Sequence, residues 1–546
     1  MAGYYRPVDR DQVYLVPPSM AEWLPVEHPV WFVIEVIKDL APELKGFHAR
    51  SVLGGTGRAG YDPMMLVTLL VYAMWQGVRS SRQIEARCHT DVAFRIVCGQ
   101  DPPDHSTIAR FRQVNAARFA DLFTQVLLLC ARNGMGRFGK VAIDGTKIAG
   151  NASKDANVSL GRIRVIAQTE VDAGLAADAD DDVDDDGAPP AALRDRTRRR
   201  ERLERVRAEL EAEQARLDQA TAAEVAHAEQ YLHDLAAGGT RPGRRPARAD
   251  AVPAARARLD RQRAAQQAKI DEYEAERAKP LQQRTRHLGA PPAPVEQAAP
   301  VRRAAEALAR AEQAAAQANE HHEPDTRQHD ADSTTPKQTK AKQAKQAKRN
   351  VTDCDSRLMP TRNGWVQGYN VQAAVTDDHL IAAVAVDNNP TDTGQAIPMM
   401  HATQAAAAAI TAHTGTHTTI GQALMDAGYD SNDNAAAPGP PRLIANSKRR
   451  HHERAAKTQP ASGPPPANAT PRQAMDHQLR TPEGIATYRR RGAIVEPIFG
   501  HLKNAIGVRQ LLTRGLTNVT GEINLAFATL NLRRLHTYIA HTAGAW

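Results

Sequence analysis

The sequence predicts an α/β domain with a mixed sheet flanked by helices, preceded by an all-α N-terminal domain and interrupted by a coiled-coil, partly disordered insertion. Three observations support this prediction. Helical apolar spacing between capped turns runs to about residue 135, β-type apolar runs begin at Lys140 and resume at Gly364, and charged helical repeats fill the region between them. A chain of 546 residues is too long for one compact core, so we expect several domains.

The expected domain boundaries follow the changes in composition. We predict a helical domain over residues 1–136, the first part of the α/β domain over 137–156, the insertion over 157–345, and the remainder with a C-terminal helix over 346–546. With the insertion removed, the order of elements is strand, strand, strand, helix, strand, helix, which suits a mixed sheet with helices beside it.

The charge balance favours a polyanionic partner. Lys and Arg number 70 against 62 Asp and Glu, a net charge of +8 with a pI near 9.3. An acidic run over residues 178–186 offsets part of the positive charge, so the rest of the chain is more basic than the total indicates. The run has no fixed geometry for a cation and is interpreted as a solvated loop.

Cysteine usage and hydropathy indicate a soluble, cytoplasmic protein without a membrane partner. The four cysteines are widely spaced and form no CxxC pair, which argues against a disulfide framework or a zinc cluster. The polar N-terminal residues do not resemble a signal peptide. The most apolar stretch, Met64–Trp75, is shorter than the roughly 20 residues that span a bilayer.

The N-terminal domain shows helix caps followed by apolar periodicity. Asp62 with Pro63 predicts one helix start and Gly77 its end, Ser80 and Ser81 offer the next cap, and Asp104 precedes a helical pattern up to residue 133. Arginines near these turns suggest DNA contacts, at Arg79, Arg82, Arg110 and Arg112. A helical scaffold with ordinary solvated arginines is an equally good interpretation.

The insertion carries leucines at heptad spacing, Leu203, Leu210 and Leu217, and then two further helical runs around residues 254–278 and 301–319. Such composition buries little apolar surface, so we expect exposed helical hairpins with disordered joints. A segment that crosses DNA or mediates self-association and a solvated spacer both remain open.

Two carboxylates end predicted strands. The run KVAIDGTKI predicts a strand that stops at Asp144, and THTTIGQALMD predicts a strand ending at Asp426. Further strands are expected over residues 365–378, 380–388 and 441–446, with a helix from Asp392 to His413. Neighbouring strands would let Asp144 and Asp426 share a cation. Mg²⁺ prefers oxygen ligands, and two ions about 3.5–4 Å apart would serve phosphoryl transfer.

Other carboxylates compete for this role. Asp353 and Asp355 could approach the site but fit a turn better, and Asp430 and Asp433 fit the cap of the next segment.

A basic helix carries the third candidate acid, Glu496. Lys503 lies seven residues after Glu496 and returns near the same helical face, whereas Arg491 lies five before it. A carboxylate flanked by cations suits DNA held against metal. A solvated basic helix is the alternative.

These segments resemble the bacterial insertion-sequence DDE transposases. Asp144 in AIDGTKI, Asp426 in DAGYDS and Glu496 in YRRRGAIVEPIFGHLK resemble the Asp-Asp-Glu triad of that family. Residues 60–95, DHSTIARFR and GWVQGYNVQAAV resemble its InsH-type group, so that the resemblance covers about residues 5–155 and 350–540.

The resemblance implies an RNase H-like domain that cuts DNA at the ends of a mobile element and transfers the strands. Two Mg²⁺ ions, or Mn²⁺ in their place, would be held by the triad. Tyr488, Arg491 and Lys503 would match the family signature, although four residues rather than the usual three separate Arg491 from Glu496, which leaves Arg490 or Arg489 as substitutes. Implied partners are terminal inverted repeats, target DNA and a second copy of the chain, as a homo-oligomer that is dimeric on DNA. A catalytically inactive DNA-binding derivative and a coiled-coil assembly protein are the alternatives.

Overall fold

The computed structural model describes residues 19–47, 60–163, 191–236, 246, 251–279, 289–320, 347–446, 454 and 458–543. The chain divides into two compact units, one of Met1–Val158 with Arg349–Trp546 and one of Ser159–Lys348. The acidic run at 178–186 lies outside the described residues.

The N-terminal part of the first unit is helical, as predicted. Its helices are α1 (Pro29–Leu40), α2 (Pro63–Trp75), α3 (Ser81–Thr90), α4 (Val92–Val97), α5 (His105–Val114) and α6 (Phe119–Arg132). The predicted start of α2 is confirmed, because the Asp62 side chain accepts a hydrogen bond from the Met64 amide at 2.8 Å and Pro63 occupies the first turn. Gly77 has a positive φ of 72° where the chain leaves this helix.

The helical pattern after Asp104 is broken rather than continuous. Asn115 and the short 3-10 helix η2 (Ala116–Arg118) separate α5 from α6, which are bent by 66°. Asn115 is buried, and its side-chain amide donates to the Phe111 carbonyl at 3.0 Å. Apolar spacing did not reveal this bend because both helices bury their apolar faces in one core.

Within the part of the chain that the structure describes, no single helix has the length and apolar character to cross a membrane. Only the bent α5–α6 pair reaches these limits together, by length and composition.

The sheet of the first unit is mixed, which confirms the predicted α/β class. Its strands are β1 (Lys140–Ala149), β4 (Arg357–Thr361), β5 (Gly364–Thr376), β6 (Ile381–Asp387), β7 (Gln422–Met425) and β8 (Arg442–Ile444). They lie in the order β4-β5-β1-β7-β8, with β6 also paired to β5. The pairs of β5 with β1, β4 and β6 are antiparallel, whereas β1–β7 and β7–β8 are parallel. Two short strands, β2 (Asn157–Ser159) and β3 (Lys348–Asn350), form a separate pair.

The sequence predicts that the first strand stops at Asp144, and this is wrong: β1 continues to Ala149. The reason is its long partner, because β5 pairs with β1 from Val141 through to Ala149. Gly368 allows the backbone of β5 to lie close to that of β1, since a Cβ atom at this position would lie 2.0 Å from the Ile148 carbonyl oxygen.

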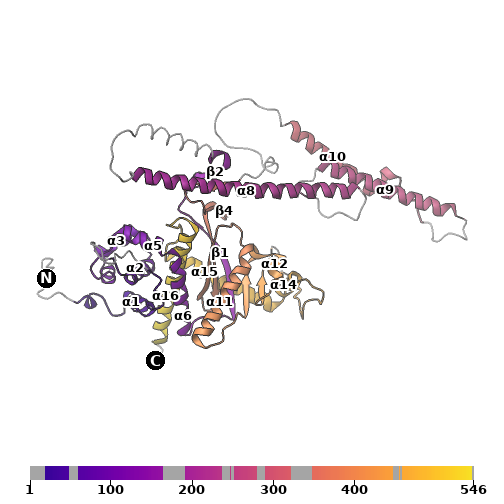
Figure 1. The fold of residues 1–546 in the computed structure, drawn as a ribbon. Coiled ribbons are helices and arrows are strands. Elements are labelled where there is room, and N and C mark those ends of the chain that lie inside the picture. The colour runs from indigo at the N-terminus through magenta and orange to yellow at the C-terminus, as the bar shows by residue number, and fades with distance from the viewer. Residues whose placement is uncertain are drawn as a thin grey trace, which may run out of the picture. The chain divides into compact units, whose positions relative to one another are not determined.

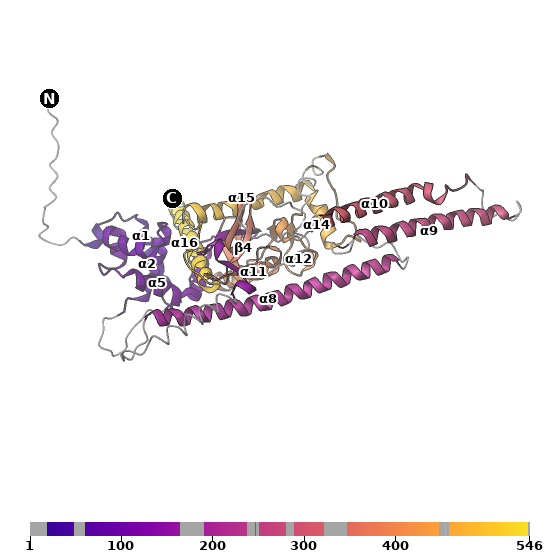
Figure 2. The same cartoon turned by 90° about the horizontal axis from the view of Figure 1, so that it is seen from above.

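The described helices that accompany the sheet are α11 (Ala396–Thr414), α12 (Asn432–Ala436), α14 (Pro471–Leu479), α15 (Pro482–Asn504) and α16 (Leu516–Ala543). Figures 1 and 2 show α16 between the N-terminal helices and the sheet, and it contacts α2, α6 and β6. Its buried residues join those of both regions in one hydrophobic core. The N-terminal helices are therefore packed on the sheet domain.

The described residues of the second unit form the long helices α8 (Ala191–Ala236), α9 (Ala251–Ala278) and α10 (Ala299–Glu320), where the sequence predicted helical runs. Helices α9 and α10 lie side by side around Leu259 and Val301. Tyr231 of α8 packs against α9 and accepts a hydrogen bond from Arg258 at 2.8 Å.

Candidate active site

The two strand-borne aspartates lie on adjacent strands. The parallel pairing of β1 with β7 sets Ile143 opposite Met425, so Asp144, the next residue of β1, lies beside Asp426, the residue that follows β7. The Asp426 side chain accepts a hydrogen bond from the Gly428 amide at 2.8 Å, which holds it at the end of β7. Burial first, and then the nearby charge of Asp426, raise the pKa of Asp144. The predicted adjacency of these two carboxylates is present in the structure.

An arginine of α15 forms an ion pair with Asp144. Nη1 of Arg491 donates to Oδ2 of Asp144 at 2.5 Å, and the two side chains are 11% and 17% exposed. Burial opposes the charge on the guanidinium, but the carboxylates of Asp144 and Asp426 outweigh it and raise the pKa of Arg491. The pair is thus a partly buried, charge-assisted contact rather than a solvated surface pair.

The same helix reaches β1 a second time. Nζ of Lys503 donates to Oγ1 of Thr146 at 2.6 Å, two residues beyond Asp144 on the strand. Burial, and then the charge of Arg509, lower the pKa of Lys503. Contacts from both Arg491 and Lys503 therefore fix α15 along β1.

Glu496 lies on α15 between these two contacts. A helix turns by about 100° per residue, so the side chains of Glu496 and Lys503, seven residues apart, leave the helix axis in directions that differ by about 20°. The side chain of Glu496 is exposed and folds back over Gly492, where a Cβ atom would lie 3.0 Å from Oε1 of Glu496.

The apolar face of α15 explains this placement. Residues Ile494, Val495, Ile498 and Leu502 are buried on it, and Tyr488 is buried as well. The helix begins with Thr481, whose side chain accepts from the Gly484 amide at 3.0 Å.

The contacts of α15 distinguish among the three adjacent arginines of the basic helix. Arg490 pairs with Asp377 at 2.8 Å, and Arg489 is exposed. Arg491 alone of the three contacts Asp144 in the described structure, despite the unusual spacing to Glu496.

One carboxylate beside the site was missed by the sequence reasoning, which treated Asp392 only as a helix cap. Oδ1 of Asp392 accepts from Lys147 at 2.8 Å, from Asn370 at 2.7 Å and from Gln372 at 2.8 Å. A Cβ atom placed on Gly428 would lie 3.0 Å from Asp426 Oδ1 and 3.1 Å from Asp392 Oδ2, so these oxygens face the same space.

The only signal for Asp392 in the sequence was its position soon after a predicted strand. That position resembles the one of Asp426 after β7. The sequence predicted β5 and β6 as two strands joined by a turn at residues 376–379, and their pairing is confirmed. It did not show that Asp392, after β6, adjoins Asp426, after β7.

The competing carboxylates serve other contacts. Asp353 accepts from the Gly515 amide at 3.1 Å and Asp355 from the Leu516 amide at 2.8 Å, so both bind the start of α16. Asp430 pairs with Arg472, and Asp433 lies in the first turn of α12.

Two of the four arginines expected at a DNA surface are instead inside the protein. Arg79 donates to the carbonyls of Gly507 at 2.7 Å and Gln510 at 2.6 Å, and pairs with Glu522 at 2.5 Å. Arg112 is buried and donates to the Arg79 carbonyl at 2.9 Å. The alternative of ordinary solvated arginines is therefore wrong for these two, because α16 and the segment before it cover them, and their contact with DNA stays a prediction. Arg82 and Arg110 are exposed.

The donor set at this edge of the sheet fits a hard divalent cation. Asp144 and Asp426 lie side by side, and Asp392 adjoins Asp426, although no three of the described carboxylates at this edge have oxygens within 4.8 Å of one another. No cysteine or histidine is among the described residues that contact these three aspartates. Such oxygen-only donors suit Mg²⁺ or Mn²⁺ rather than a metal that prefers sulfur or imidazole.

Two family models match the chain. Residues 18–114 match a transposase domain (DUF772), and residues 447–536 match a transposase DDE domain. The second match contains Tyr488, Arg491, Glu496 and Lys503. No curated protein and no solved structure matches the chain.

Proposed function

This chain belongs to the DDE transposases of insertion sequences, and from that premise we propose that it cuts DNA at the ends of a mobile element and joins the freed 3′-ends to target DNA. The observation that carries the proposal is the adjacency of Asp144 and Asp426 on β1 and β7, with Arg491 of α15 at the first of them.

The strand arrangement supports an RNase H-like domain. Antiparallel strands β6, β5 and β1 adjoin the parallel strands β7 and β8, and the chain enters the sheet by its central strand. Asp426, just after the end of β7, and Asp144, beside it within β1, then lie near the space where a ligand of an open α/β sheet binds.

Asp144, Asp426 and Glu496 would hold the divalent cations, Mg²⁺ or Mn²⁺. Such ions, when bound, activate the attacking oxygen and stabilise the leaving oxygen of a phosphodiester. Gly428 orients Asp426 through its amide, and the Lys503–Thr146 contact fixes α15 and so the position of Glu496. Arg491 would exchange its bond to Asp144 for a DNA phosphate, which its planar guanidinium can bind with two hydrogen bonds.

The proposed partners are the terminal inverted repeats, target DNA and a second copy of the chain. The net charge of +8 supports a nucleic acid partner, because phosphate contacts supply most of the affinity of such proteins for DNA.

The test is Mg²⁺-dependent cleavage of a duplex that carries the inverted repeats flanking the reading frame. We expect Asp144→Asn, Asp426→Asn and Glu496→Gln each to cut about 100-fold more slowly or worse while still binding the duplex. Asp433→Asn is the matched control, since this exposed aspartate lies in α12, and it should cut like the wild type.

Cleavage at wild-type rates by all three variants would overturn the site assignment. A wild-type protein that shifts the duplex but never cuts it would instead identify an inactive DNA-binding derivative.

A further inference from the structure

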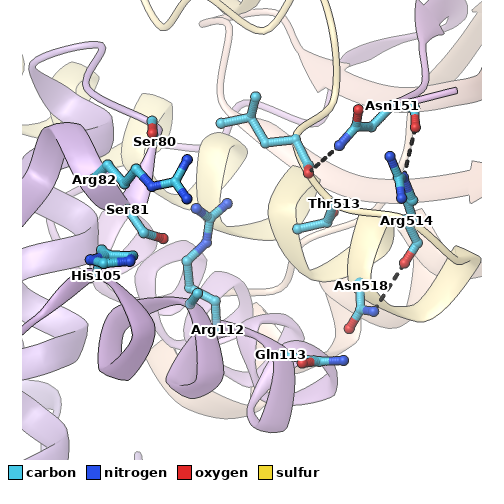
Figure 3. A pocket seen from close by; sticks show the side chains of 12 residues that line it. Ser80, Ser81, Arg82, His105, Arg112, Gln113, Asn151, Thr513, Arg514 and Asn518 are labelled. Carbon is cyan, nitrogen blue, oxygen red and sulfur yellow. Dashed lines mark hydrogen bonds between the residues drawn. The ribbon is translucent and has the colours of Figure 1, made fainter. Parts of the chain in front are cut away.

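A pocket in the first unit is lined mainly by basic and neutral hydrogen-bonding side chains. It has a volume of about 680 Å³ and lies between α3, α5 and the segment that leads into α16 (Figure 3). Its charged lining comes from Arg82, Arg112 and Arg514, and the described residues that line it include no aspartate or glutamate. Serine, threonine, glutamine and asparagine side chains make up most of the rest.

Behind the pocket lies a buried group of charges with an excess of one positive charge. Glu522 pairs with Arg79 at 2.5 Å and accepts a hydrogen bond from the Thr513 amide at 3.0 Å. Burial works against its charge, but Arg112 and Arg79 keep the pKa of Glu522 below its ordinary value. Two guanidinium groups thus share one carboxylate, and an uncompensated buried charge is unfavourable.

Arg112 belongs to this buried group of charges and also lines the pocket. Its Nη1 donates to the Arg79 carbonyl at 2.9 Å, whereas its buried Nη2 has no hydrogen-bond partner among the described residues. The residue is only 9% exposed. Figure 3 shows its guanidinium extending from α5 toward Arg82 of α3. A buried N–H group of this kind is normally satisfied, so its position points to a missing acceptor.

The start of α3 faces the same space. Ser80, Ser81 and Arg82 line the pocket, and they are the N-cap and the first two residues of this ten-residue helix. No side chain in the described structure caps its first-turn amides. Free amides at a helix start bind anions, and the helix dipole adds to the attraction.

We propose that this pocket binds one internucleotide phosphate of DNA. The proposal rests on the proposed function and deepens it, because it adds a DNA contact away from the cleavage site. Arginine, serine, threonine and amide side chains together with helix-start amides are the groups that contact DNA phosphates.

The location fits an outer contact rather than the scissile phosphate. Asn151 lines the pocket just beyond the end of β1, and Ala149 lies five residues after Asp144. Five strand residues span about 17 Å, which equals the rise of about five base pairs along the DNA axis at about 3.4 Å each. Arg82 lies in the matched transposase domain and Arg514 in the matched DDE domain, so one phosphate would be held by both.

The experiment measures binding of the full chain to a fluorescent 30-base-pair duplex in EDTA, over a range of salt concentrations. Because no cleavage occurs in EDTA, the result does not depend on the catalytic acids. Arg82→Ala and Arg514→Ala replace exposed side chains, so both variants should fold. Arg132→Ala, an exposed arginine at the end of α6, is the matched control.

We expect each pocket variant to lower the slope of log Kd against log salt by about one, and the double variant to lower it no further, because one phosphate is involved. Arg112→Lys, which keeps the charge but loses the unpartnered N–H, should weaken binding about 10-fold. Arg132→Ala should leave the slope unchanged.

A second measurement tests whether the pocket binds small anions instead of DNA. It compares the melting temperature of the protein with and without inorganic phosphate or adenosine monophosphate. Wild-type slopes in both single variants would overturn the proposal, even if the catalytic variants behave as expected. Stabilisation by the mononucleotide that the pocket variants lose, with unchanged DNA slopes, would also overturn it and assign the pocket to a free nucleotide.

Discussion

Arg491 donates a hydrogen bond to Asp144 at 2.5 Å, although 347 residues separate them in the sequence. The contact places the positive guanidinium group beside a carboxylate that a divalent cation would also bind. Since one oxygen of Asp144 cannot serve both cations at full strength, the arginine and the metal compete for it.

Removal of this arginine should therefore separate metal affinity from activity. We expect Arg491→Ala to bind Mg²⁺ more tightly than the wild type in calorimetry without DNA, because Asp144 loses its competing partner. Cleavage should fall about 10- to 100-fold, because the carboxylate and the phosphate lose their orienting group. Arg490→Ala is the control, since Arg490 pairs with Asp377. A larger loss of cleavage in Arg490→Ala would assign the signature role to Arg490.

Asp392 should contribute to cleavage without being part of the proposed triad. Its Oδ1 binds Lys147, Asn370 and Gln372, and Asp392→Asn would leave Lys147 without its counter-charge. Measured well below the melting temperature of the variant, cleavage should fall about 10- to 100-fold. The melting temperature should fall too, because the partly buried ion pair with Lys147 is lost. Asp387→Asn, at the end of β6, should cut normally. Equal rates for the two variants would show that Asp392 has no role in the site.

The buried carboxylate of Glu522 should make stability depend on pH. Although burial opposes its charge, Arg112 and Arg79 hold its pKa below the ordinary value, so its stabilising effect is present above about pH 4.5 and is lost as the pH falls below that. At pH 7, Glu522→Gln should lower the free energy of unfolding by about 3–5 kcal/mol. In urea unfolding, the difference from wild type should shrink below about pH 4.5. A difference that stays constant across this range would contradict the assignment.

The close approach of β5 to β1 should make Gly368 intolerant of a side chain. A Cβ atom there would lie 2.0 Å from the Ile148 carbonyl oxygen, so Gly368→Ala must push the two strands apart. We expect a loss of about 1–3 kcal/mol in stability. Gly500→Ala in α15 is the matched control, because a Cβ atom there meets nothing within 4 Å. This change should be neutral or stabilising by up to about 1 kcal/mol. Equal melting temperatures for both variants would refute the steric argument.

Local signals predicted most elements of the fold. The cap at Asp62, the strand next to Asp426 and the helix carrying Glu496 all have causes within a few residues, so local sequence predicted them, although the strand ends one residue earlier, at Met425. The end of β1 could not, because the Asp144–Gly145 pair looks like a turn and only the length of β5 shows that the strand continues. The bend at Asn115 was also missed, because α5, η2 and α6 pack on α16, which lies far later in the sequence, at Leu516–Ala543.

The candidate site divides in the same way. The sequence by itself determined which acids and cations are available, since residue type and local periodicity select Asp144, Asp426, Glu496 and the basic helix around Glu496. Only the tertiary structure decided that Arg491 rather than Arg490 binds Asp144, that Asp392 adjoins Asp426, and that Arg79 and Arg112 are buried. The physical reason is that charge pairing and burial depend on distance in space, which strand pairing and helix packing set between residues far apart in the chain.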